Sequence, residues 1–248
     1  MPLIIQILST NSKDLTLQLI VTGSHLSKKL GETVNQIKID GFKIDSKIEI
    51  LGKDDSSESI LNSISTGLSK FPECYKTLKP DLLLVLGDRY EIFAAVTAAL
   101  FSKIPVAHIH GGEVTEGAFD ESLRHSITKM SHIHFTSNKQ HKLRVEQLGE
   151  NPKNVFDVGS PGVEFIKSMQ LLSKEKIQEI IGTQFRKKNY LITFHSETLE
   201  RNSSPKQQIS KLLKVLQDLE DSSFIFTKAN ADPGGIAINN ELENFVKN

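Results

Sequence analysis

The feature that most constrains the fold is an apolar run, Leu82–Leu86, followed at once by Gly87-Asp88-Arg89 and then by a helical pattern. A strand that is apolar at every position is covered on both faces, as the strands of parallel sheets are. Similar short apolar segments alternate with segments of helical spacing along the chain. This alternation predicts an α/β fold with parallel sheets and helices on either side.

The short apolar segments are predicted to be strands, and the segments between them helices. The predicted strands are Leu15–Val21, Leu82–Leu86, Pro105–Ile109, Ile133–Thr136, Val155–Val158, Leu191–Phe194 and Phe224–Thr227. The predicted helices are Ser59–Leu78, Tyr90–Phe101, Glu121–Met130, Lys139–Leu148 and Pro205–Leu219, and Pro2–Leu8 has the character of a helix interior.

A domain boundary is expected at Val158-Gly159-Ser160-Pro161-Gly162, where glycine and proline follow a predicted strand. Residues 1–158 would form a first domain and residues 159–248 a partial second one. The second block holds two good predicted strands, which is few for an independent sheet.

Composition excludes several classes of protein. Thirty Lys and Arg balance thirty Asp and Glu, which argues against a general binder of nucleic acid or anionic membranes. The single cysteine, Cys74, allows no internal disulfide and no cysteine-framed zinc site. The apolar stretch near Ile92–Phe101 is half the length of a membrane span, and the N-terminal residues do not resemble a signal peptide. We therefore expect a soluble, cytoplasmic protein.

The first cluster that could carry chemistry is Gly87-Asp88-Arg89, at the carboxyl end of a predicted strand and just before a helix. Open α/β sheets place ligands at this position. Asp88 could take part in acid–base chemistry, and Arg89 could bind phosphate. The alternative is that Asp88 only caps the following helix.

The second cluster is His108-Ile109-His110-Gly111-Gly112-Glu113, at the end of the next predicted strand. Alternation along a strand would put His108 and His110 on one face. Two such histidines could be metal ligands, as in metal-dependent hydrolases, although no complete set of ligands accompanies them. The two glycines instead suggest a backbone that passes close to a ligand. His132 and His134 lie in an apolar context and are interpreted as structural.

The third cluster is Asp120-Glu121-Ser122-Leu123-Arg124-His125. Asp120 occupies an expected N-cap position, and Arg124 and His125 follow one turn later, which suits a site for an anionic leaving group. The alternative is an ordinary helix cap with surface pairing. All three clusters are expected at the same edge of one sheet. Two weaker candidates, His195 and Asn230, follow later strands, and Asp232 is expected to cap a helix starting at Pro233.

Together these segments resemble the hydrolysing UDP-N-acetylglucosamine 2-epimerases, in particular the branch that serves sialic and legionaminic acid biosynthesis. The specific part of the resemblance runs from Gly87 to His134. It is carried by Val21–Leu26, Gly87-Asp88-Arg89, His110–Glu113 and Asp120–His132, with Thr193-Phe194-His195 and Asn230-Ala231-Asp232 farther on.

The resemblance implies a GT-B-like α/β fold, with two Rossmann-like domains and a UDP-sugar in the cleft between them. It implies elimination of UDP to give a glycal and then addition of water, which leaves the free sugar inverted at C-2. The sugar would be N-acetylglucosamine or a 2,4-diacetamido sugar. No cofactor is implied, and the full-length protein is expected to be a homodimer.

The resemblance also assigns residues. Asp88 and Asp120 match catalytic carboxylates, and His110 and Glu113 are further catalytic candidates, with His110 standing where many relatives have a glutamate. No metal ligand is assigned. The candidate substrate-binding residues are His25, Arg89, Arg124, His125, His195 and Asn230.

Against this family, the first strand and the end of the second domain are expected to be missing. We therefore expect weak or no activity from these 248 residues alone. The alternative function is a non-catalytic fragment or pseudo-enzyme that binds a nucleotide sugar or a partner.

Overall fold

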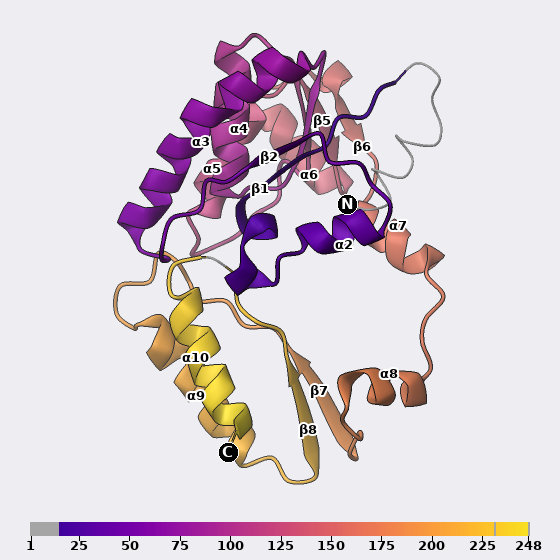
Figure 1. Ribbon diagram of the computed structural model, residues 1–248, viewed down its shortest axis with the longest axis vertical. Coiled ribbons are helices and arrows are strands. Elements are labelled where there is room, and N and C mark those ends of the chain that lie inside the picture. Colours follow the sequence, from indigo (N-terminus) through magenta and orange to yellow (C-terminus); the bar gives the residue numbers. More distant parts are fainter. Residues whose placement is uncertain (1–14, 231, 248) are drawn as a thin grey trace. The chain divides into compact units, whose positions relative to one another are not determined.

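A computed structural model describes residues 15–230 and 232–247 (Figure 1). The chain divides into two compact units. The first contains the described residues up to Lys53 together with Ser57–Lys167, and the second contains Asp54–Ser56 and the described residues from Ser168 onward. The helical character expected for Pro2–Leu8 lies outside the described residues. Helices and strands alternate, so the predicted α/β class is confirmed.

The main sheet of the first unit has four parallel strands in the order β3-β4-β5-β6. These are β3 (Leu83–Leu86), β4 (Val106–Ile109), β5 (Ile133–Thr136) and β6 (Val155–Asp157), each within a residue or so of its predicted bounds. All four residues of β4 are buried, as expected for an inner strand covered on both faces. The parallel order places the carboxyl ends of these strands along one edge.

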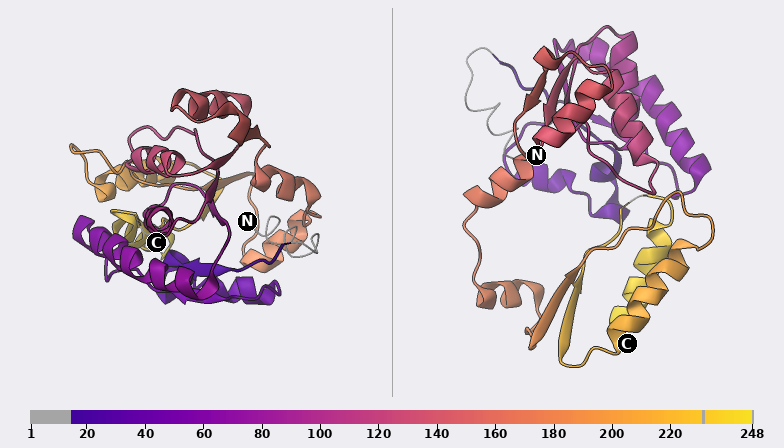
Figure 2. Two further views of the ribbon diagram at one scale, coloured as in Figure 1. Left: turned by 90° about the horizontal axis from the view of Figure 1, so that it is seen from above. Right: turned by 180° about the vertical axis from the view of Figure 1, so that it is seen from behind.

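Four helices accompany this sheet: α3 (Ser57–Leu78), α4 (Tyr90–Phe101), α5 (Asp120–Lys129) and α6 (Lys139–Gln147). In Figure 2, α3, α4 and α5 pack side by side, and α6 packs on β5 and β6. Small residues let α3 and α4 pack closely. Gly67 on α3 has no side chain, and a Cβ there would lie only 2.9 Å from the Cβ of Ala94 on α4. The resulting hydrophobic core holds the loops that follow β3 and β4 in place.

A smaller parallel pair, β1 (Ile20–Thr22) and β2 (Ser46–Ile48), completes the first unit. It is joined by η1 (Gly23–Leu26), η2 (Lys28–Leu30) and α2 (Val34–Ile39), and η3 (Pro152–Asn154) and α7 (Pro161–Ser168) flank β6. The predicted start of the first strand at Leu15 is wrong. The strand begins only at Ile20, because the backbone N–H of Leu19 binds the Asp45 carboxylate, 2.8 Å away, instead of a neighbouring strand.

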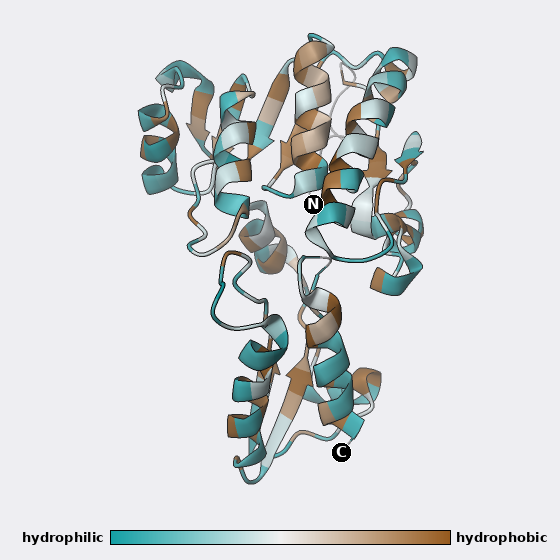
Figure 3. Ribbon diagram, turned by 90° about the vertical axis from the view of Figure 1, so that its left-hand side faces the viewer, coloured by the Kyte–Doolittle hydropathy of each residue, from teal (hydrophilic) through white to brown (hydrophobic). Residues whose placement is uncertain are grey.

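The second unit contains α8 (Lys174–Ile181), β7 (Lys188–Ile192), α9 (Pro205–Gln217), β8 (Ser222–Phe226) and α10 (Gly235–Lys247). β7 and β8 pair in parallel, and α9 packs against α10. In Figure 3, α9 and α10 alternate between hydrophilic and hydrophobic residues along their length, as amphipathic helices do. Ser204 and Gln207 form a capping box that fixes the start of α9.

Three boundaries in the second unit differ from the prediction. β7 begins three residues before the predicted Leu191, because four of its five residues are exposed and its apolar pattern is weak. β8 begins at Ser222 rather than Phe224. The helix expected to start at Pro233 begins at Gly235, after a turn in which the Gly235 N–H donates to the Asp232 carbonyl. Across the described part of the chain, no helix combines the length and the apolar character needed to cross a membrane.

Candidate functional site

Arg124 lies at the centre of the candidate site. Its side chain projects from α5, is 4% exposed, and donates through Nη2 to Asp88 and, at 2.7 Å, to the Thr115 hydroxyl. Through Nη1 it donates to the backbone carbonyl of Glu113 at 3.0 Å and to the Glu121 carboxylate at 3.1 Å. One guanidinium therefore joins the loop after β3, the loop after β4 and the start of α5.

The structure shows neither the N-cap expected at Asp120 nor the cap that was the alternative role of Asp88. The N-cap of α4 is Arg89 and not Asp88, whose carboxylate binds Arg124 instead. The N-cap of α5 is Phe119, which already has helical backbone angles, so that Asp120 is the first residue of the helix. Asp120 is followed by Glu121, which is one of the two carboxylates that bind Arg124.

A second set of contacts surrounds the Glu113 carboxylate. His110 Nδ1 lies 2.5 Å from Glu113 Oε1, and the Ser137 hydroxyl donates to the same oxygen at 2.8 Å. His141 Nδ1 lies 2.9 Å from the Ser137 hydroxyl and 3.9 Å from Glu113 Oε1. Burial opposes ionisation of Glu113, but the hydrogen bonds from His110 and Ser137 outweigh it and hold the pKa of Glu113 below its usual value. Glu113 is thus an ionised acceptor shared by an imidazole and a hydroxyl.

The loop that carries this pair has an unusual backbone. His110 has a φ of +68°, in the left-handed region, and its N–H donates to the Phe135 carbonyl. Gly112 has a φ of +79°, Arg144 donates to its carbonyl, and a Cβ at Gly112 would meet the carbonyl oxygen of His141. Backbone strain of this kind is concentrated at functional sites.

The expectation that His108 and His110 share one face of a strand is wrong. β4 ends at Ile109, so strand alternation does not reach His110, while His108 is fully buried and its Nε2 lies 2.8 Å from the Gly87 carbonyl. Within the residues that the structure describes, no group of three or more His, Cys, Asp or Glu side chains is arranged to hold a metal ion.

The Glu121 carboxylate extends the cluster along α5. It accepts from the Thr115 N–H at 2.7 Å and lies 3.0 Å from His125 Nε2. Burial opposes its ionisation, but these contacts and the Arg124 charge hold the pKa of Glu121 below its usual value. His125 is thereby held next to the cluster.

Arg89 and His25 lie on segments that approach each other. Arg89 Nε donates to the Glu91 carboxylate at 3.2 Å. A Cβ on Gly23, which has a φ of +63°, would lie 2.7 Å from Glu91 Oε1, so η1 packs directly against Glu91. His25 follows two residues later, and its Nδ1 lies 2.7 Å from the Thr33 hydroxyl.

His195 and Asn230 follow β7 and β8 in the second unit. The two loops are joined by a hydrogen bond of 2.8 Å from Thr227 to Thr193. The Asn239 side chain fixes the loop before Asn230 by binding both the N–H and the carbonyl of Ala229. The structure therefore brings these two candidates into one pair of connected loops.

Sequence reasoning named Glu121 as part of the third cluster without giving it a role, and it missed Thr115, Ser137 and His141. Ser137 directly follows β5, so the strand-end rule that found Asp88 and His110 would also have found it.

The structural interpretation of His134 fits its surroundings, because this ring is buried and its Nε2 lies 3.1 Å from Glu150. Burial lowers the pKa of His134, and His132 Nδ1 accepts the Val106 N–H.

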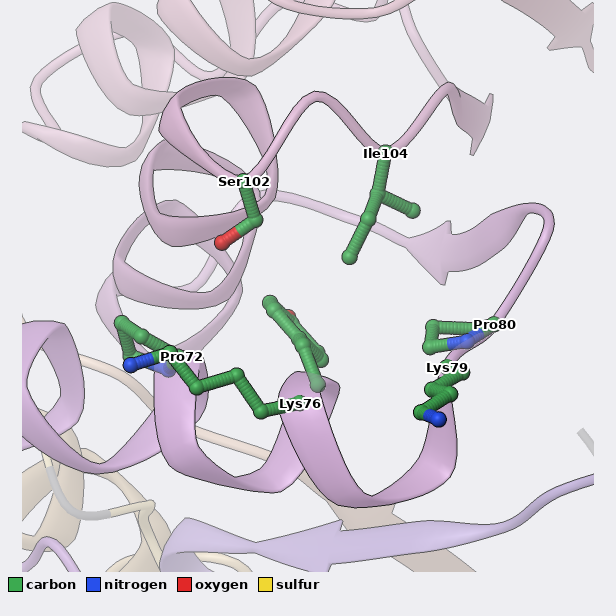
Figure 4. Close-up of a pocket in the computed structure, with 7 residues that line it drawn as sticks. Pro72, Lys76, Lys79, Pro80, Ser102 and Ile104 are labelled. Atoms are coloured by element: carbon green, nitrogen blue, oxygen red, sulfur yellow. The ribbon is translucent and has the colours of Figure 1, made fainter.

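A separate shallow pocket of about 210 Å³ lies at the opposite edge of the sheet (Figure 4). Pro80 and Ile104, which line it, precede β3 and β4, so the pocket is at the amino ends of these strands. Its lining contains no carboxylate and no histidine. We therefore place the candidate site at the carboxyl edge, where the ionisable groups meet.

A sequence model of the UDP-N-acetylglucosamine 2-epimerase family matches residues 8–248. This chain is a member of that family. The chain is 45% identical over 237 residues to the GDP/UDP-N,N'-diacetylbacillosamine 2-epimerase (hydrolyzing) of Campylobacter jejuni, covering 96% of this chain and 61% of that protein. It is 34% identical to the UDP-N,N'-diacetylbacillosamine 2-epimerase (hydrolyzing) of Legionella pneumophila, covering 95% and 62%. This epimerase-family chain thus spans about three-fifths of the length of the curated relatives it matches.

Solved structures of this epimerase family share the fold. The UDP-GlcNAc 2-epimerase from Neisseria meningitidis, bound to UDP-GlcNAc, aligns with a TM-score of 0.75 at 22% identity, covering 98% of this chain and 65% of that one. The expected GT-B-like fold class with parallel sheets is therefore confirmed.

Proposed function

We propose that this chain carries the acid–base groups of a hydrolysing 2-epimerase that acts on a UDP-linked 2-acetamido sugar. The observation that carries the proposal is the proximity of two side-chain pairs, His110–Glu113 and Asp88–Arg124. Arg124 links them, because it also donates to the backbone carbonyl of Glu113. Membership of the epimerase family supports the reaction class.

The reaction has two balanced steps. A base removes the proton from C-2 while the C-1–oxygen bond breaks, so that UDP leaves with the electron pair and a glycal forms. Water then supplies hydroxide to C-1 and a proton to C-2 on the opposite face, which gives the free epimer. The site must therefore provide a base, an acid and stabilisation for the diphosphate.

The His110–Glu113 pair suits the proton transfers. The ionised Glu113 orients His110 through Nδ1, which leaves Nε2 to exchange a proton with the sugar. Asp88 and Asp120 supply the further carboxylates that the family pattern expects. Asp88 Oδ2 accepts a hydrogen bond from Arg124, which holds this carboxyl group near the start of α4.

The phosphate-binding role falls to Arg89 and not to Arg124. All four hydrogens on the terminal nitrogens of Arg124 are directed at Asp88, Thr115, Glu113 and Glu121 within the protein. We assign Arg124 the task of organising the site. Arg89 stands at the N-cap of α4, where the helix dipole also favours an anion. His25, His125, His195 and Asn230 remain proposed substrate contacts.

For the sugar, we propose a UDP-linked 2,4-diacetamido sugar ahead of UDP-N-acetylglucosamine. The Campylobacter and Legionella relatives named above, at 45% and 34% identity, both carry diacetylbacillosamine in their names. A homodimer and a cytoplasmic location are also part of the proposal. Light scattering and cell fractionation test these two points.

The decisive experiment incubates the purified chain in D₂O with each UDP-sugar and measures released UDP together with the ¹H spectrum of the sugar. We expect slow UDP release, in keeping with the weak activity expected of these 248 residues, and a C-2 epimer that carries deuterium at C-2, with the diacetamido substrate preferred. Binding of UDP without any product would favour the non-catalytic alternative and contradict the proposal. The Asp88→Asn variant serves as the inactive control.

A further inference from the structure

His108 is a fully buried histidine that the proposed proton transfers do not use. It is the third residue of β4, with a side chain inaccessible to solvent. A buried imidazole on an inner strand costs free energy unless its ring nitrogens are hydrogen-bonded. The partners of this ring therefore indicate what it does.

Both ring nitrogens of His108 have partners. Nε2 lies 2.8 Å from the Gly87 carbonyl oxygen, which can only accept, so Nε2 carries the proton. Burial is the main reason that the pKa of His108 falls to about 4, so the ring is neutral at neutral pH and Nδ1 is an acceptor. The Thr128 hydroxyl lies 3.2 Å from Nδ1 and 3.0 Å from the Arg124 carbonyl oxygen, so its single hydrogen is shared between these two acceptors.

These partners belong to the segments that carry the candidate site. Gly87 immediately precedes Asp88. Thr128 lies one turn after Arg124 on α5, and its hydroxyl also lies 3.0 Å from the Arg124 carbonyl. On the third segment, a Cβ at Gly111 would lie 3.2 Å from His108 Nδ1, so the backbone between His110 and Glu113 packs against the same ring.

We propose that His108 is a positioning residue whose neutral, Nε2-protonated ring sets the relative positions of the Asp88 loop, the His110–Glu113 loop and the Arg124 helix. The expected effect on turnover rests on the function proposed above, whereas the expected effect on the positions of the three segments does not. The ring acts through these neighbours and does not contact substrate. An error of about 1 Å in the placement of reacting groups lowers the rate about 100-fold.

His134 provides a matched control. It faces His108 in the register of β4 and β5, and it is equally buried. Its Nε2 binds Glu150, which lies outside the three site segments. Replacing either histidine by leucine removes a buried imidazole, but only His108→Leu removes the contacts that this ring makes with Gly87, Gly111 and Thr128.

The kinetic test compares His108→Leu, His108→Gln, Thr128→Val and His134→Leu. We expect His108→Leu to lower kcat about 100-fold with KM nearly unchanged. His108→Gln, whose amide can still donate to the Gly87 carbonyl, recovers most of that loss. His134→Leu lowers stability but leaves kcat per folded molecule intact. If His108→Leu does not fold, a low kcat in Thr128→Val beside near-normal His108→Gln supports the proposal.

A second readout does not depend on turnover. In ¹⁵N-labelled protein, we expect His108 to show the neutral Nε2–H form, and we expect His108→Leu to shift the signals of the His110 ring and the Asp88 carboxyl while His134→Leu leaves them in place. An Nδ1–H form, unchanged His110 and Asp88 signals, or equal kcat losses in the two leucine variants would overturn the inference. Absence of turnover in the unmodified chain, with the expected spectra, would contradict only the proposed function.

Discussion

The carbonyl oxygen of His141 lies so close to the Cβ position of residue 112 that a side chain there would clash with it, and Gly112 avoids the clash. This relationship presses the loop after β4 against the first turn of α6. It also brings Glu113 within reach of Ser137 and His141.

The first prediction concerns this contact. Gly112→Ala adds a methyl group against a backbone carbonyl at a φ of +79°, whereas Gly159→Ala meets the same backbone penalty at +78° with no atom within 4 Å. We expect Gly159→Ala to lower the free energy of unfolding by about 1 kcal/mol and Gly112→Ala by about 3 kcal/mol. Urea denaturation of both variants measures the difference, and equal losses would contradict the steric argument.

The second prediction concerns the buried guanidinium. Arg124→Met leaves Asp88 and Glu121 without their cation, and we expect the free energy of unfolding to fall by about 3 kcal/mol. The control is Lys176→Met, which breaks an exposed ion pair with Glu179 and is expected to cost less than about 1 kcal/mol. Denaturation midpoints that shift equally in the two variants would show that Arg124 does not organise the cluster.

The third prediction concerns pH. The folded-state pKa of Glu113 lies below its ordinary value of 4.5, so ionised Glu113 stabilises the fold above that pH, and this contribution is lost as the pH falls through the lowered value. The difference in unfolding free energy between the unmodified chain and Glu113→Gln should therefore shrink as the solution is acidified below pH 4.5. A difference that stays constant with pH would contradict the lowered pKa.

The fourth prediction separates the chemistry of His110 from its backbone. Asparagine tolerates a φ of +68°, so His110→Asn should fold while losing the imidazole. We expect kcat for UDP release to fall by about 100-fold to 10,000-fold, which is the range for loss of general acid–base catalysis. Circular dichroism checks the fold, and a kcat within a few-fold of the unmodified chain would exclude His110 from proton transfer.

Much of the fold was predictable because the inner strands are apolar at nearly every position. β3, β4 and β5 were located within one residue on this basis. β2 has three residues and was missed, and β7 was displaced because it is mostly exposed and has no strong alternation. Exposure, and not length alone, thus limited the prediction.

The candidate site was predicted as a set of strand ends but not as a set of contacts. Asp88 and His110 were found because each follows a predicted strand, and Arg124 because it lies one turn after the start of a predicted helix. The partners of Arg124 could not be found in this way, because α5 turns Glu121 toward the guanidinium while β4 ends before His110. Helix phase and loop conformation, which single residues do not encode, decide these contacts.

The two units have separate hydrophobic clusters, and Ile209 and Ile238 anchor the one in the second unit. Every group joined through Arg124 and Glu113 belongs to the first unit. On heating, we therefore expect two calorimetric transitions. Unfolding of the second unit alone would leave the proton-transfer groups assembled, but it would no longer hold His195 and Asn230 in place.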